Sequence, residues 1–282
     1  MSIAVTGATG HLGRLTVESL LNRGVPAAEI VALGRDTSRL ADLAERGVTV
    51  RQADYNDPAS LRAAFAGADK VVFVSGTELG RRVEQARNVA AAAKQAGVSL
   101  IAYTSITKAD TSSLVLATEH RGVEQEIVAS GLPYVFLRNS WYFENYLPQI
   151  PTYLRYGIAG AAGDGRVSAA ARADYAEAAA AVVTTEGHAN RAYELGGAPF
   201  TLTGLAEELS RQAGREVSYT DLPEEKYVEM LVGAGVPADF AAVLADGDRG
   251  LALGELEVEG DDLARLLGRP PVTLAEAIRA AL

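Results

Sequence analysis

The sequence predicts an α/β fold, in which a doubly wound parallel sheet is accompanied by a smaller α/β lobe towards the C-terminus. Short apolar runs alternate with segments of helical period through the first half of the 282 residues. These runs do not alternate between apolar and polar residues, as a strand with one solvent-exposed face does. Strands that are apolar throughout are typical of parallel sheets covered by helices on both sides. Glycines at positions 24, 47, 97 and 131 each follow a predicted helix, where a left-handed C-terminal residue is favoured.

The strands of this sheet are predicted over residues 2–6, 29–33, 48–52, 70–74, 100–104 and 134–137. The helices between them are predicted over residues 12–22, 38–46, 59–65, 79–96 and 116–129. The regular alternation of predicted strands and helices ends after Arg138. Aromatic residues cluster there, and a glycine loop follows at 163–165. Asp174 is then expected to cap an alanine-rich helix. The rest of the chain is predicted to form strands over 192–195 and 216–220, a helix over 202–212 and further helices.

Composition excludes several classes of protein. The net charge of −10 argues against a general surface for nucleic acid or anionic membranes. Cysteine is absent, which excludes disulfides and thiol catalysis. The three histidines, at positions 11, 120 and 188, are far apart and lack the spacing of metal ligands. No apolar stretch is long enough to span a bilayer. We therefore expect a cytoplasmic protein without a metal, and a hydrophobic content of 48% is ample for a core.

Glycines recur every third residue directly after the first predicted strand, at Gly7, Gly10 and Gly13. Such a turn lets backbone N–H groups approach an anion at the positively polarised start of a helix, and Gly13 allows that helix to pack closely on the sheet. The spacing differs from G-x-G-x-x-G, and a glycine triplet alone is often only a tight turn. In its strand-to-helix context the motif favours a dinucleotide site. The residues expected to contact the dinucleotide here are Gly7, Thr9, Gly10, His11 and Leu12.

The second strand ends beside Arg35, where a guanidinium can clasp a 2′-phosphate. We therefore expect NADPH rather than NADH as cofactor; the alternative is a solvated arginine at a strand end. Asp54 and Tyr55 follow the third strand and are expected at the adenine edge, although the same residues fit a turn before the next helix. Ser75 and Gly76 after the fourth strand, and Thr104 in the fifth, are expected to frame the ribose and nicotinamide.

Several motifs occur together in one order along the chain. They are Thr-Gly-Ala-Thr-Gly-His-Leu-Gly at 6–13, Gly-Arg-Asp at 34–36, Asp-Tyr-Asn-Asp-Pro at 54–58, Tyr-Thr-Ser at 103–105, His120 with Val-Glu at 123–124, Ser-Gly-Leu-Pro at 130–133 and Leu-Arg-Asn at 137–139. The sequence thereby resembles atypical short-chain dehydrogenases of the NmrA-like group, in particular its members that reduce quinones and triphenylmethane dyes. The resemblance covers nearly the whole chain. It implies a Rossmann domain over 1–139, to which about 160–195 is expected to return, a substrate lobe mainly over 140–282, and a cleft between them.

The chain departs from ordinary short-chain dehydrogenases at their Tyr–Lys pair. The corresponding positions hold Leu116 and His120, and leucine cannot donate a proton, which disfavours carbonyl reduction by that pair. Ser105 stands where the family's serine stands, and it is a candidate for orienting the nicotinamide or substrate. His120 is a candidate for a proton donor or a contact to the nicotinamide ribose; a structural histidine fits equally well.

The residues after the sixth strand are candidates for substrate contacts. Asn139 can hydrogen-bond the substrate or the cofactor carboxamide, and Trp141 and Tyr142 can form a flat wall for a planar acceptor. Alternatively, these rings pack the junction between domain and lobe.

The leading hypothesis is an NADPH-dependent reductase that delivers hydride to quinones or related planar electrophiles. The alternative is a nucleotide-sensing regulatory protein without turnover, which would share the glycine loop. A homodimer is compatible with the apolar face of the helix over 79–96, which fits a core equally well.

Overall fold

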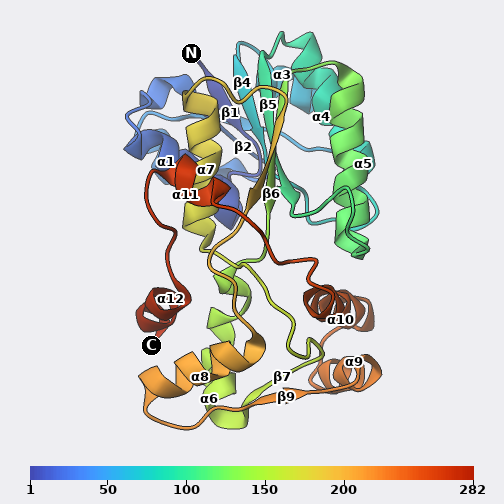
Figure 1. Cartoon of the computed structure of the whole chain (residues 1–282). Coiled ribbons are helices and arrows are strands. Elements are labelled where there is room, and N and C mark those ends of the chain that lie inside the picture. The colour runs from blue at the N-terminus through green and yellow to red at the C-terminus, as the bar shows by residue number, and fades with distance from the viewer.

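A seven-stranded parallel sheet forms the centre of the computed structural model, which describes residues 1–282 (Figure 1). Its strands are β1 (Ile3–Val5), β2 (Ile30–Gly34), β3 (Thr49–Gln52), β4 (Lys70–Phe73), β5 (Leu100–Ile106), β6 (Tyr134–Asn139) and β8 (Arg191–Leu195). They lie in the order β3-β2-β1-β4-β5-β6-β8, and every neighbouring pair is parallel. The order reverses direction between β1 and β4, which is the point where open α/β sheets bind ligands. The predicted fold class is confirmed.

Helices cover both faces of this sheet (Figure 1). On one face lie α1 (His11–Asn22), α7 (Arg172–Thr184) and α11 (Asp262–Leu267), and on the other lie α3 (Pro58–Phe65), α4 (Arg82–Gln95) and α5 (Val115–Ser130). The strands are apolar on both sides for this reason. Ile3 and Val5 belong to the core beneath α1 and α7, whereas Ala4 between them belongs to the core beneath α3, α4 and α5.

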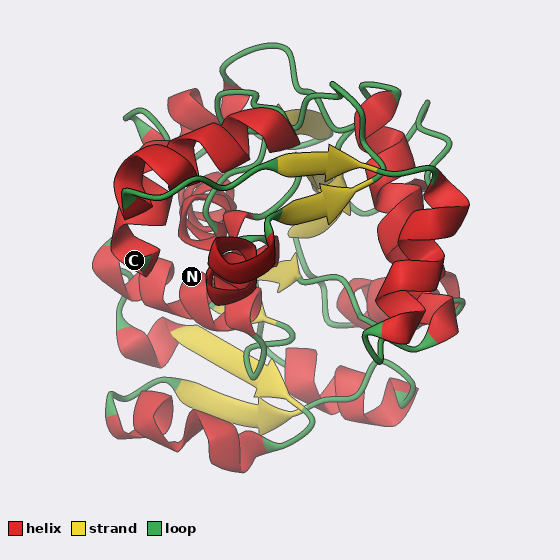
Figure 2. Ribbon diagram, turned by 90° about the horizontal axis from the view of Figure 1, so that it is seen from below, coloured by secondary structure: helices red, strands yellow, loops and turns green.

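A smaller lobe lies at the carboxyl edge of the sheet, and Figure 2 views the molecule from that side. Its two short strands, β7 (Ile158–Gly160) and β9 (Tyr219–Asp221), pair in parallel. Its helices are α6 (Ile150–Tyr156), α8 (Leu202–Ala213), α9 (Glu224–Gly233), α10 (Ala238–Ala252) and α12 (Leu274–Ala281). The chain passes between the two parts repeatedly: α7 and β8 follow β7, and α11 packs against α7 after α10. No helix combines the length and the hydropathy needed to cross a bilayer.

Three local predictions need correction. The helix predicted over 38–46 is divided into a 3-10 turn (Thr37–Leu40) and the short α2 (Ala41–Glu45). The helix predicted from residue 79 begins only at Arg82, because the preceding residues form a loop after β4. Asp174 does not cap α7, which begins at Arg172. Instead, the buried carboxylate of Asp174 accepts the Val272 N–H at 2.8 Å and so holds the C-terminal segment.

The apolar face of α4 forms core. Ala86, Val89 and Ala93 are buried against the sheet and α5, so the face that the sequence left open between core and interface is internal.

Candidate functional site

A cavity of about 350 Å³ lies at the carboxyl edge of β1, β2, β3 and β4. Ten predicted cofactor-binding residues line it: Gly7, Thr9, Gly10, His11, Leu12, Arg35, Asp54, Tyr55, Ser75 and Gly76. The remaining lining residues are Thr6, Gly13, Leu33, Gly34, Ala53, Val74, Thr77, Glu78, Gln85, Tyr142 and Arg172. Residues from four separate strand ends therefore meet in one place, because parallel strands present their carboxyl ends at the same edge.

The glycine loop has the geometry that its sequence predicts. Gly7 has a φ of +61°, and its carbonyl accepts the Gly10 N–H at 2.9 Å. A Cβ at Gly13 would lie 2.3 Å from that same carbonyl oxygen, so only glycine fits there. No side chain caps α1, and its first intrahelical hydrogen bond runs from the Arg14 N–H to the Gly10 carbonyl. The N–H groups between Gly10 and Arg14, in the first turn of α1, have no intrahelical acceptor. They can therefore bind an anion in the cavity.

Tyr55, which follows β3, lines the cavity and forms hydrogen bonds with residues that follow β1 and β4. Its hydroxyl lies 2.6 Å from the Thr6 hydroxyl and donates to the Val74 carbonyl at 2.6 Å. The Thr6 hydroxyl in turn accepts the Val74 N–H at 3.0 Å. Burial raises the pKa of Tyr55, so its hydroxyl stays protonated at neutral pH. The predicted turn at Asp54 also exists, since its carboxylate accepts the Asn56 N–H at 2.9 Å.

Thr104 lies behind the cavity wall instead of in it. Its side chain is buried, and its hydroxyl accepts the Ser75 N–H at 2.9 Å. This bond fixes the turn after β4, so Thr104 positions Ser75 and Gly76 from beneath.

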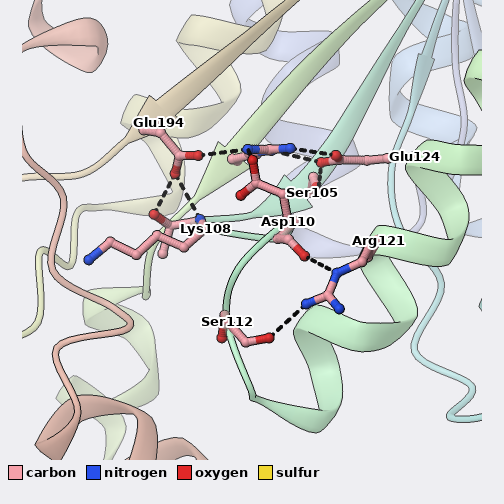
Figure 3. Close-up of polar contacts among 10 residues, drawn as sticks. Ser105, Lys108, Asp110, Ser112, Arg121, Glu124 and Glu194 are labelled. Carbon is pink, nitrogen blue, oxygen red and sulfur yellow. Dashed lines mark hydrogen bonds and ion pairs between the residues drawn. The ribbon is translucent and has the colours of Figure 1, made fainter.

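Ser105 is buried and lies outside the cavity, in a row of polar side chains across three strands (Figure 3). The register aligns it with Arg138 on β6 and with Glu194 on β8. The Ser105 hydroxyl donates to Glu124 at 2.6 Å, and Arg138 donates to the same carboxylate at 2.8 and 3.0 Å. Arg138 also contacts Glu194 at 3.1 Å. The one guanidinium of Arg138 thus compensates the buried carboxylate of Glu124 and also contacts the half-buried Glu194.

His120 is also away from the cavity lining. Its Nδ1 lies 2.7 Å from the Tyr103 hydroxyl, and both side chains are buried between β5 and α5. Burial, with a smaller contribution from the nearby charge of Arg82, lowers the pKa of His120 to about 3. The imidazole is therefore neutral at neutral pH. Leu116, which was compared with the tyrosine of ordinary short-chain dehydrogenases, packs with the lobe core.

The three substrate candidates lie at the junction of sheet and lobe. Asn139 is 3% exposed, and its Oδ1 is buried without a hydrogen-bond partner in the chain. Tyr142 lines the cavity, whereas Trp141 packs with the lobe core, its ring 3.6 Å from where a Cβ of Gly247 on α10 would lie. The structure thus separates two residues that the sequence left equally open, with Tyr142 at the cavity and Trp141 in the packing position.

Among the cavity residues that were not predicted are three with charged or amide side chains. Arg172, at the start of α7, lies with its guanidinium carbon 5.1 Å from the centre of the Tyr142 ring. Glu78 and Gln85 come from the loop after β4 and from α4. Gln85 is 2% exposed, and its Oε1 has no partner. No local pattern marks these residues, because tertiary packing alone brings them to the strand ends. No group of three or more acidic or histidine side chains is arranged to hold a metal.

The model of the NmrA-like family matches residues 1–249. The chain belongs to the NmrA-like family. It is 48% identical to quinone oxidoreductase 2 of Escherichia coli (strain K12) over 278 residues, covering 98% of this chain and 97% of that protein. It is 30% identical to the NAD(P)H azoreductase of Xenophilus azovorans over 282 residues, covering 99% and 97%.

Solved structures of family members superimpose closely. The crystal structure of the NADPH-dependent quinone oxidoreductase of E. coli complexed with NADPH gives a TM-score of 0.96 at 47% identity, over 99% of both chains. The triphenylmethane reductase of Citrobacter sp., complexed with NADP(H), gives a TM-score of 0.95 at 40% identity, over 100% of both chains. The family resemblance predicted from the motifs is confirmed.

Proposed function

We propose that this protein is an NADPH-dependent reductase that transfers hydride to quinones or related planar electrophiles, triphenylmethane dyes included. The observation that carries the proposal is the cavity at the carboxyl edge, which joins a glycine loop at a helix start to an arginine after β2. The family relatives that reduce quinones, dyes and azo compounds support the same activity.

The residues of the cavity fit a dinucleotide. The uncapped start of α1 and the Gly7–Leu12 loop suit a pyrophosphate, and Arg35 suits the 2′-phosphate. Asp54 and Tyr55 lie where the adenine edge is expected. Gln85 also lines this cavity, and its buried Oε1 has no hydrogen-bond partner in the chain.

The chain's own residues supply orientation for the reaction. Bound NADPH supplies the hydride. We assign Ser75 and Gly76, held from behind by Thr104, to the ribose and nicotinamide end, and the unpaired Oδ1 of Asn139 to the substrate or carboxamide. Tyr142 is proposed as the flat wall of the acceptor site, and Trp141 as its support. Ser105 is proposed to position this end through its strand.

Protons for a quinone are proposed to come from water. Leu116 has no proton to give, and the buried, neutral His120 is bonded to Tyr103, which favours a structural role over proton transfer.

A second candidate function is NAD(P) sensing without turnover, as in a regulatory protein. The observation that favours it is Leu116, which stands in place of an acid. We also propose a cytoplasmic location.

The test of function follows nicotinamide absorbance with NADPH, a panel of quinones and triphenylmethane dyes, and NADH in parallel. We expect each protein molecule to oxidise many molecules of NADPH. The acceptor that gives the highest rate identifies the substrate class. Tight NADPH binding without turnover on any acceptor would contradict the reductase and favour the sensor.

A further inference from the structure

We propose that Glu78 is a specificity-determining residue, which weakens the preference for 2′-phosphorylated cofactor by competing with the phosphate for Arg35. The inference rests on the proposed role of Arg35 in the reductase. It starts from an ion pair at the cavity: Arg35 Nη1 lies 3.2 Å from Glu78 Oε1, and both residues line the cavity.

The two partners are held very differently. The second carboxylate oxygen of Glu78 accepts from Gln85 at 3.1 Å and from Asn56 at 3.4 Å. Gln85 is buried in α4, so the carboxylate is fastened to the wall of the cavity. The Arg35 side chain is 68% exposed, and its other nitrogens have no protein partner. The Glu78 side chain is less exposed, at 41%, and has three hydrogen-bond partners, so Arg35 is the freer partner of the two.

A phosphate held by Arg35 must come within hydrogen-bond distance of the guanidinium. The fixed carboxylate of Glu78 is itself at that distance, so the two anions compete for one cation and repel each other. A cofactor without the 2′-phosphate meets neither effect. Glu78 consequently lowers the affinity for the 2′-phosphorylated cofactor alone. The preference for NADPH over NADH is therefore smaller than it would be with Arg35 and without Glu78.

The experiment measures binding of two nucleotide fragments, 2′,5′-ADP and 5′-ADP, by titration calorimetry at low salt. The variant is Glu78→Gln, which removes the charge and keeps an oxygen to accept from Gln85. Glu84→Gln is the matched control, because Glu84 is an exposed residue of the same helix as Gln85, pairs with Arg81 and does not line the cavity. Thermal melting verifies that both variants fold.

We expect Glu78→Gln to lower the Kd for 2′,5′-ADP by about three- to tenfold. The range reflects two effects that the variant removes: the exposed ion pair with Arg35 and the repulsion between the carboxylate and the phosphate. The Kd for 5′-ADP should change by less than about twofold, and Glu84→Gln should shift both ligands little and equally. Raised salt should shrink the gain. Weaker or unchanged 2′,5′-ADP binding, or equal tightening of both fragments, would overturn the inference. Failure of both fragments to bind the unaltered protein would instead remove the proposed cofactor site, and this inference with it.

Discussion

The Tyr103 hydroxyl and the His120 Nδ1 lie 2.7 Å apart in a buried pair between β5 and α5. Burial raises the pKa of Tyr103 well above its ordinary value and lowers that of His120 to about 3. Neither group changes charge near neutral pH. Between pH 3 and 6.5 the unfolded chain binds a proton that native His120 does not, so this histidine makes the free energy of unfolding fall as the pH falls through that window.

Replacing His120 by glutamine should leave the pH profile of kcat/KM unchanged between pH 6 and 8. The reason is that no protonated imidazole exists there to be lost. Rates of NADPH oxidation with a quinone measure the profile, and His188→Gln, at a partly exposed histidine bonded to Tyr193, serves as the control. Loss of one limb of the profile in His120→Gln alone would restore a proton-transfer role.

Arg35→Ala should raise the KM for NADPH by roughly ten- to hundredfold and change that for NADH by less than about twofold. A hydrogen bond to a charged group contributes about 1.5–3 kcal/mol, and only the phosphorylated cofactor makes it. Arg39→Ala removes a nearby exposed arginine that does not line the cavity, so it should affect neither cofactor. Equal losses with both cofactors would exclude the 2′-phosphate role.

Gly13→Ala should weaken NADPH binding by at least about tenfold and lower Tm. The new methyl group would lie 2.3 Å from the Gly7 carbonyl oxygen, so the loop or α1 must shift, at a cost of about 1–3 kcal/mol. Gly233→Ala is the matched control, because it lies at the end of α9 with no atom within 4 Å of its added Cβ. Quenching or enhancement of NADPH fluorescence gives the Kd; wild-type affinity in Gly13→Ala would refute the close approach.

Asp248 provides a pH-dependent test of the lobe. Its Oδ2 accepts the Ala161 N–H at 2.7 Å, and burial raises its pKa to about 6, against the opposing effect of that hydrogen bond. The native state therefore binds more protons than the unfolded chain between about pH 4 and 6, and the free energy of unfolding falls as the pH rises through this window.

Asp248→Asn removes the buried charge and keeps an acceptor for Ala161. We expect its Tm to exceed that of the unaltered protein by about 2–5 °C at pH 7.5, with a smaller gain at pH 5. Asp239→Asn, in the exposed first turn of the same helix, should change Tm little and equally at both pH values. The same gain for Asp248→Asn at both pH values would contradict a raised pKa.

The parts of the site that local sequence encodes could be predicted. Apolar runs without alternation identify the strands, and the residues directly after β1, β2, β3 and β4 then meet at one edge because the strands are parallel. Glu78, Gln85 and Arg172 reach that edge from a loop and two helices, and only packing determines which of their side chains face inwards. The role of Asp174 was mistaken for a similar reason. Its partner, Val272, is 98 residues away, whereas the capping pattern is local.

Reduction of a triphenylmethane dye distinguishes direct hydride transfer from separate transfer of electrons and a proton. Reduction places the hydride on the central carbon of the dye, where it does not exchange with water. The measurement is mass spectrometry of the leuco product, formed in ordinary water from NADPH that carries deuterium on one or the other face of C4.

A fixed cofactor site presents one face of the nicotinamide to the acceptor. If hydride passes directly from one face of the nicotinamide, one labelled cofactor should give one deuterium per product molecule and the other should give none. Product without deuterium from both labelled cofactors would contradict it, because electrons and a solvent proton would then have arrived separately.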